Sequence, residues 1–163
     1  MDGDWIESPY IVNEGIRYLT TGNVGEINFK KQGNGYISQK TFEELNCLKV
    51  LPNDLLISRL NEPYGRACIL PDNEEPFYIV AVDIVVLRPD DEYNKRFLLY
   101  AMNSPNHTQE VGLMAKGTTM HRISRTALGN IEMFLHSPSK SLLPIFLMTN
   151  VPRLKLLSKT KKK

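Results

Sequence analysis

Two polar stretches of this sequence hold side chains that suit contacts with an anionic or hydrogen-bonding ligand. The first stretch contributes Arg59, Asn61, Tyr64 and Arg66, and the second contributes Lys116, Thr118, Thr119, His121, Arg122 and Arg125. Arginine and lysine donate to phosphate oxygens and to guanine acceptors, and an asparagine amide can pair with adenine. Between Val111 and Ile131 there are three cationic residues and no carboxylate. This pattern fits a DNA-contact surface, and it also fits ordinary solvated loops.

The sequence indicates no catalytic centre. The residue types of a hydrolase triad are present in Asp54, Ser58 and His121, but the Gly-x-Ser-x-Gly motif that exposes a serine nucleophile is missing. The stretch Lys116-Gly117-Thr118 lacks the upstream glycine of a phosphate-binding loop, and no Gly-x-Gly-x-x-Gly motif occurs. We therefore expect a protein that is not an enzyme and that has no cofactor.

The sequence does not indicate a metal site, a disulfide or a membrane-spanning segment either. The three histidines, His107, His121 and His136, are isolated from other metal-ligand residues. Cys47 and Cys68 fit no redox or zinc motif, and their apolar surroundings favour buried thiols in a reducing compartment. The sequence shows no signal peptide and no apolar run of about 20 residues. We expect a cytoplasmic protein without a metal site or a membrane contact.

The net charge of +2 hides an uneven distribution of charge along the chain. Seven of the 20 lysines and arginines lie after His136, where no carboxylate occurs, so residues up to Leu135 are mildly acidic. A DNA-binding argument must therefore rest on where the cations lie, and not on the isoelectric point.

The hydrophobic pattern predicts one α+β domain with a mixed or antiparallel sheet and flanking short helices. We expect strands at 16–19, 55–58, 66–70, 77–87 and 131–134. We expect helices at 39–45, 94–102, 104–114 and 125–128, with Ser38 and Ser124 as N-caps. The 77–87 stretch is almost entirely apolar, which predicts a strand buried on both faces. The domain is expected over residues 2–135, followed by an irregular basic tail over 136–163.

Several ordered motifs resemble a known family. They are Gly15-Ile-Arg-Tyr-Leu-Thr-Thr-Gly-Asn-Val24, then Asp54-Leu-Leu-Ile-Ser-Arg59 with Gly65-Arg-Ala67, and then Ala115-Lys-Gly-Thr-Thr-Met-His-Arg-Ile-Ser124 with Leu128-Gly-Asn-Ile131. Together they resemble the target recognition domain of type I restriction-modification specificity subunits. The resemblance covers roughly Asp2 to Phe134, and several motifs in order are more specific than any one of them.

The resemblance implies a non-catalytic, sequence-specific DNA-binding role. Such specificity subunits usually hold two of these domains, separated by long helices, and each domain recognises one half of a split target in double-stranded DNA. Modification subunits methylate adenine with S-adenosylmethionine, and a restriction subunit that is a motor and nuclease cuts unmodified DNA. Two alternatives stay open: a recognition domain that serves another DNA adenine methyltransferase, and a protein-interaction module that binds no DNA.

The residues expected to contact DNA are polar and mostly cationic. They are Lys30, Arg59, Asn61, Tyr64, Arg66, Lys116, Thr118, Thr119, His121, Arg122 and Arg125. Structural roles are the alternative for some of these motifs: Arg59 can pair with Asp54 or Asp83, and the stretch 20–23 can shape a turn.

The two ends depart from the family, which implies a chain truncated at both ends. The family has a further segment upstream of the position of Asp2. After Phe134 it continues with a Pro-Pro-Leu-x-Glu-Gln motif and a long helix, whereas this chain has an apolar tail without acidic residues. A shifted reading frame over 142–158 permits a family-like helix sequence, so we hypothesise an out-of-frame remnant of the spacer helix. The alternative is a genuine basic tail that touches phosphates without sequence preference.

Overall fold

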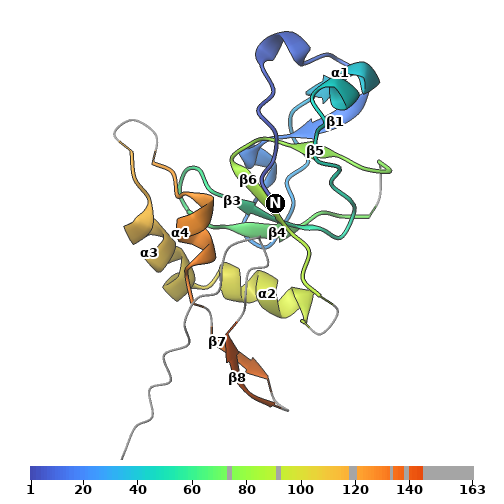
Figure 1. Ribbon diagram of the computed structural model, residues 1–163. Helices are drawn as coiled ribbons and strands as arrows, with labels where there is room; N and C mark the ends of the chain where they lie inside the picture. Colours follow the sequence, from blue (N-terminus) through green and yellow to red (C-terminus); the bar gives the residue numbers. More distant parts are fainter. Residues whose placement is uncertain (73–74, 91–92, 118–120, 133, 138–139, 145–163) are drawn as a thin grey trace, which may run out of the picture.

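The computed structural model describes residues 1–72, 75–90, 93–117, 121–132, 134–137 and 140–144 (Figure 1). Within these ranges no helix has both the length and the apolar character needed to cross a membrane. Residues 145–163, which hold most of the basic tail and of the hypothesised out-of-frame remnant, lie outside the described residues.

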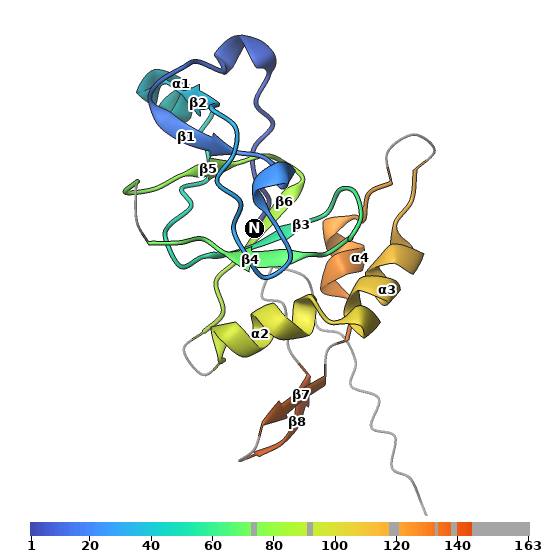
Figure 2. The same cartoon turned by 180° about the vertical axis from the view of Figure 1, so that it is seen from behind.

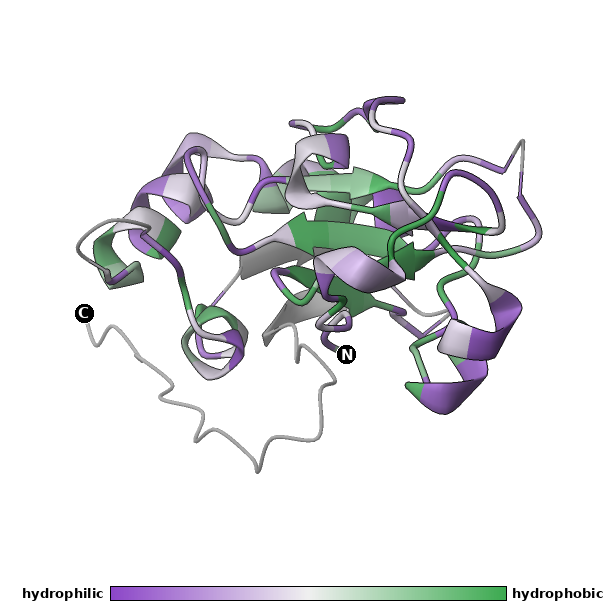
Figure 3. Cartoon of the chain, turned by 90° about the horizontal axis from the view of Figure 1, so that it is seen from above, coloured by the Kyte–Doolittle hydropathy of each residue, from purple (hydrophilic) through white to green (hydrophobic). Residues whose placement is uncertain are grey.

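The central sheet is antiparallel, with the strand order β4-β3-β6. Its strands are β3 (Leu55–Ser58), β4 (Ala67–Ile69) and β6 (Ile84–Leu87). Strands β3 and β4 form the hairpin that the sequence predicts, with Leu56 opposite Cys68. Every residue of β3 is buried. Figure 3 shows the strands at the centre of the molecule in the hydrophobic colour, with more polar segments around them.

The apolar stretch at 77–87, which was expected to form one strand, forms two short strands in different sheets. Strand β5 (Ile79–Val80) ends before a turn in which Ile84 N donates to Ala81 O over 2.8 Å, and β6 follows this turn. Asp83 lies within the turn. A carboxylate inside a strand with apolar neighbours on both faces would be buried at a large cost, so the chain turns at this residue. The prediction of one continuous strand was wrong because it weighed the apolar residues and not this carboxylate.

The second sheet is mixed and has the strand order β2-β1-β5. Strand β1 (Ile16–Leu19) pairs antiparallel with β2 (Tyr36–Ile37) and parallel with β5. Two single turns of 3₁₀ helix flank β1, namely η1 (Ser8–Tyr10) and η2 (Thr21–Asn23). The expected α+β domain with mixed and antiparallel strand pairing is confirmed.

Short helices surround the sheets, and each begins at a polar cap. They are α1 (Gln39–Glu44), α2 (Lys95–Met102), α3 (Pro105–Met114) and α4 (Arg125–Gly129). The side chains of Ser38, Asn94, Ser104 and Ser124 each accept a hydrogen bond from the backbone N–H three residues later. These bonds satisfy donors that have no partner inside the first helical turn. The predicted caps Ser38 and Ser124 are confirmed.

The two faces of the central sheet bury different cores. Leu55 and Ile57 of β3 pack in one cluster with residues of α2, α3 and α4. Leu56, which points to the opposite face, packs with Leu19 of β1 and Val80 of β5. This alternation follows from the two-residue period of a strand. Helices therefore cover one face of the sheet and the second sheet covers the other (Figure 1).

A short hairpin follows α4 in the chain. It consists of β7 (Phe134–Ser137) and β8 (Lys140–Pro144), which pair antiparallel. The strand expected at 131–134 thus begins at Phe134, and its partner comes from the region that the sequence analysis expected to be irregular.

Candidate nucleic-acid interface

The two polar stretches of the sequence analysis lie side by side. We call residues 59–66, between β3 and β4, the tip, and residues 116–125 the cationic loop. Leu60 of the tip forms an antiparallel bridge with Arg122 of the cationic loop. One residue further on, Ile123 N donates to the carbonyl oxygen of Arg59 over 3.1 Å. Figures 1 and 2 show the tip next to the coloured part of the cationic loop from opposite sides of the molecule.

The cationic loop is closed at its base by its own backbone. Lys116 N donates to Arg122 O over 3.0 Å, and Arg122 N donates to Lys116 O over 2.9 Å. Lys116 and His121 are both exposed. Thr118 and Thr119, two of the predicted contact residues, lie outside the described residues.

The carboxylate of Asp83 lies between two arginines of the predicted surface. Arg122 Nε is 2.8 Å from Asp83 Oδ1, and Arg59 Nη2 is 3.9 Å from the same oxygen. Arg59 is only 4% exposed and also donates to the Val82 carbonyl oxygen, and burial lowers its pKa. The Arg122 side chain is 43% exposed. Arg59 therefore supports the interior, whereas Arg122 is a surface group that Asp83 orients.

Arg66 donates to backbone oxygens of two separate segments. Its Nε atom donates to Val24 O over 2.7 Å, and its Nη2 atom donates to Thr21 O over 2.9 Å. Its Nη1 atom lies 3.2, 3.0 and 3.3 Å from the carbonyl oxygens of Leu60, Asn61 and Pro63. The planar guanidinium suits such a set of acceptors, because its donors point outward in a fixed fork. Arg66 thus joins the tip to η2, a role that its residue type alone did not reveal.

Tyr64 and Gly65 pack the base of the tip against α3. Tyr64 is 9% exposed and belongs to the core cluster that contains Val111. Gly65 has a φ of +74°, and a Cβ atom there would lie 3.0 Å from Val111 Cγ2. The glycine of the Gly65-Arg-Ala67 motif is therefore explained by its backbone conformation and by the close approach of α3. Tyr64 is a core residue in this structure.

Arg125 and Lys30 lie apart from the bridge between the tip and the cationic loop. Arg125 begins α4, and its Nη1 atom is 3.4 Å from Asp2 Oδ2. Lys30 is exposed on a separate segment, where its backbone N donates to Asn23 O over 2.8 Å. Arg125 thus flanks the cationic loop, while Lys30 belongs to the loop that follows η2.

Asn23 explains the polar motif at 20–23. Its Oδ1 atom accepts from Thr20 N over 2.9 Å, and its Nδ2 atom donates to the carbonyl oxygens of Lys30 and Gln32 over 2.9 and 2.8 Å. Its side chain is buried. The motif therefore shapes η2 and anchors the following loop, as the structural alternative in the sequence analysis expected.

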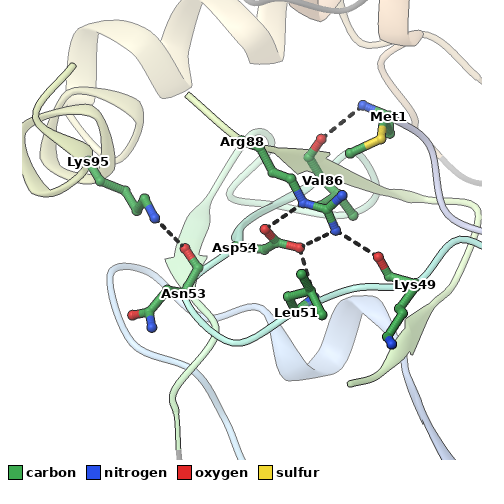
Figure 4. Close-up of polar contacts among 8 residues, drawn as sticks. All are labelled: Met1, Lys49, Leu51, Asn53, Asp54, Val86, Arg88 and Lys95. Atoms are coloured by element: carbon green, nitrogen blue, oxygen red, sulfur yellow. Dashed lines mark hydrogen bonds and ion pairs between the residues drawn. The ribbon is translucent and has the colours of Figure 1, made fainter. Parts of the chain in front are cut away.

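The residue types of a hydrolase triad do not meet at one site. Ser58 is fully buried and donates to Leu60 O over 3.0 Å. Asp54 lies at the other end of β3, where Arg88 binds both of its oxygens over 2.8 and 2.7 Å (Figure 4). Among the described residues no group of three or more His, Cys, Asp and Glu side chains is placed to hold a metal ion.

Three further titratable groups are buried. His107 in α3 has no hydrogen-bond partner on either ring nitrogen within the described part of the chain, and burial lowers its pKa to about 4. Burial raises the thiol pKa of Cys47 to about 11 and that of Cys68 to about 12. Both cysteines are free thiols. Because the thiolate is the reactive form of cysteine, these raised pKa values favour the less reactive thiol at both positions.

Two polar residues outside the set expected to contact DNA support the interface. Asp83, which was considered only as a partner for Arg59, lies 3.9 Å from Arg59 and also orients Arg122. Asn103 follows α2 and binds the backbone of Ala67 at the end of the tip. The only feature of the sequence that could have pointed to this role is the position of the asparagine between two expected helices.

Solved structures share this fold. One is described as the crystal structure of a type I restriction-modification system S subunit from M. genitalium, with a TM-score of 0.51 and 18% identity over 82% of this chain. A second comes from work on complex assembly and conformational transition of the type I R-M system, with a TM-score of 0.56 and 19% identity over 91% of this chain. The match spans 30% and 31% of those chains, respectively. No protein-family model and no curated protein matches the chain. The chain has the fold of one part of a type I restriction-modification S subunit.

Proposed function

We propose that this chain binds double-stranded DNA with sequence specificity, as one half-site reader of a type I restriction-modification specificity subunit. The observation that carries the proposal is the pairing of the tip with the cationic loop through Leu60 and Arg122. Two segments that are far apart in the sequence thereby present their side chains at one place. A single stretch of duplex would contact both.

The accessible side chains at this place are of the types that DNA interfaces use. They are Asn61, Lys116, His121, Arg122 and the partly exposed Arg125. Lysine and arginine bind phosphate oxygens and set the register, while side chains that reach base edges select the sequence. Asp83 and Asp2 hold Arg122 and Arg125 at 2.8 and 3.4 Å. These pairs give the guanidinium groups a defined position and keep the net positive charge of the surface small.

In this proposal the chain itself is non-catalytic, and partner subunits act on the DNA that it selects. One of the structural neighbours is described in terms of complex assembly of the type I R-M system, which supports such partners. A modification subunit would methylate the selected site and a restriction subunit would cut unmodified DNA, in the cytoplasm. Because this chain spans less than a third of either neighbour, we assign it one half-site.

The proposal is tested by measuring how the full chain binds duplex DNA over a range of salt concentrations. Arg122→Ala is expected to lower the affinity for every duplex and to reduce the slope of log K against log salt by about 0.9 if Arg122 binds one phosphate. If Arg122 instead binds a base, the loss appears at one base pair as about 1–3 kcal/mol.

A matched control removes a cation far from the tip. Lys40 in α1 is exposed and pairs with Glu44 at 3.6 Å, so Lys40→Ala should leave affinity and salt slope unchanged. Equal losses in both variants would indicate a general charge effect. If the wild-type chain binds no duplex at low salt, the proposed function is wrong.

A further inference from the structure

The tip turns most of its polar side chains inward and leaves two outward at its end. Arg59 and Tyr64 are buried and Arg66 donates to backbone oxygens, whereas Asn61 and Glu62 are exposed. The Asn61 side chain makes no hydrogen bond within the described part of the chain. Its amide is therefore free to bind a ligand.

The tip is held from several directions by bonds to its backbone. Gly65 N donates to Ser58 O over 2.9 Å, which closes the loop at its base. On one side Ile123 of the cationic loop donates to Arg59 O. On the other side the Arg66 guanidinium joins the carbonyl oxygens of the tip, including Asn61 O at 3.0 Å, to those of η2.

A surface group that is held in place before binding loses less conformational entropy when it binds. It also discriminates better between similar ligands, because it cannot move to accommodate the wrong one. The backbone support of the tip therefore gives a residue at its end a defined position from which to contact a partner.

We infer that Asn61 is a specificity-determining residue that recognises adenine in the major groove, and that Arg66 is the positioning residue that presents it. This inference rests on the proposed DNA-binding function. A carboxamide offers one acceptor and one donor side by side, which matches the N6 amino group and N7 of adenine. Glu62 offers only acceptors when ionised, so it fits the amino group of cytosine instead.

A simpler explanation for Asn61 is its backbone conformation. Its φ is +61°, and asparagine adopts this region more readily than most residues. Glycine adopts it at least as readily and has no amide. Asn61→Gly therefore separates the two explanations, because it keeps the conformation and removes the group that would bind adenine.

The experiment selects bound duplexes from a random library with the full chain, and then measures affinities for duplexes that differ at single positions. For Asn61→Gly we expect preference for one A·T pair to fall by about 5- to 150-fold, with the salt slope and the melting temperature unchanged. Asn61→Asp, which has no donor, should lose the same adenine preference. Unchanged preference at every position in both variants overturns the inference but leaves DNA binding intact.

Arg66 is tested against an arginine at the opposite end of β3. Arg66→Lys keeps the charge but cannot span both segments, so it should weaken the same base-pair preference at temperatures where the protein is folded. Arg88→Lys disturbs a comparable set of bonds, to Asp54 and to Lys49 O, away from the tip (Figure 4). It should lower the melting temperature and leave base preference unchanged. If both variants, or neither, change the preference, Arg66 is not the positioning residue.

The outcomes separate this inference from the function on which it rests. A wild-type chain that binds no duplex refutes both. A wild-type chain that binds duplexes without any base preference refutes the adenine assignment and leaves only general DNA binding. A preference that responds to Glu62→Gln and not to Asn61→Gly assigns the tip to cytosine and also refutes the inference.

Discussion

The side chain of Asn103 pairs with both backbone groups of Ala67. Ala67 N donates to Asn103 Oδ1 over 3.1 Å, and Asn103 Nδ2 donates to Ala67 O over 2.9 Å and to Leu99 O over 2.7 Å. Ala67 begins β4, the edge strand that leaves the tip. The junction between α2 and α3 is thus fastened to the strand that supports the proposed DNA-binding surface.

Asn103→Ala should lower the free energy of unfolding by about 1–3 kcal/mol, because it removes the side-chain partner of the buried Ala67 N–H; the carbonyl oxygens of Ala67 and Leu99 keep their bonds from Ile27 N and from the backbone N of residue 103. Urea unfolding measures the change. Asn106→Ala, an exposed position in α3, is the control and should change stability by no more than about 0.5 kcal/mol. Equal effects of the two substitutions would show that the bonds to Ala67 contribute little.

Removing Arg88 should destabilise the protein because Asp54 is buried and ion-paired with it. The Arg88 side chain is 38% exposed, so water can replace part of the interaction, and we expect a loss of about 1–3 kcal/mol for Arg88→Ala. The exposed pair between Lys40 and Glu44 provides the comparison. Lys40→Ala should cost less than about 0.5 kcal/mol in the same urea titration.

Gly65→Ala should destabilise the protein more than Gly33→Ala. Both glycines have similar positive φ values, +74° and +72°, so both variants incur about 1–2 kcal/mol of backbone strain. At Gly65 the new methyl group also lies 3.0 Å from Val111 Cγ2, whereas at Gly33 no heavy atom lies within 4 Å. The difference in melting temperature measures how tightly α3 packs on the tip, and equal melting temperatures would contradict this packing.

Stability should fall with acidification because of His107. Its folded-state pKa is about 4, below the ordinary value of 6.5, so the unfolded chain binds more protons between these two pH values. Above pH 6.5 the histidine is neutral in both states and does not lower the free energy of unfolding. Below this value the free energy of unfolding decreases as the pH falls toward 4, by up to about 1.4 kcal/mol per pH unit.

The test for His107 compares urea midpoints at several pH values between 4 and 7. His107→Leu should flatten the dependence in this range, since an apolar side chain takes up no proton. His121→Ala, at an exposed position, is the control. A wild-type profile that stays flat from pH 6.5 to 4 would contradict the burial of an unpartnered imidazole.

Much of the fold follows from local signals in the sequence. Ser38 and Ser124 were expected as caps because their side chains satisfy the first N–H groups of a helix, and that contact needs only neighbouring residues. The hairpin of β3 and β4 followed in the same way from two apolar runs around a turn. The break at Asp83 was missed because the expectation weighed the apolar residues of 77–87 and not the single carboxylate among them.

The residue types of the candidate site were predictable from the sequence, but whether each side chain points inward or to the surface was not. Arg59, Arg66 and Arg122 carry the same group, yet the first is buried, the second donates to backbone oxygens and the third is accessible. Only tertiary packing distinguishes these roles. The sequence did place the two stretches on loops, and their contact through Leu60 and Arg122 is a long-range feature that no local pattern encodes.

The bonds of Arg66 end on main-chain oxygens, which every amino acid possesses. Replacing the exposed residues at positions 61 and 62 therefore removes none of these hydrogen bonds, provided that the new residue tolerates the local backbone angles. Such a loop can be diversified without rebuilding the scaffold beneath it. Variants randomised at positions 61 and 62 would accordingly be a starting point for retargeting the protein to new sequences.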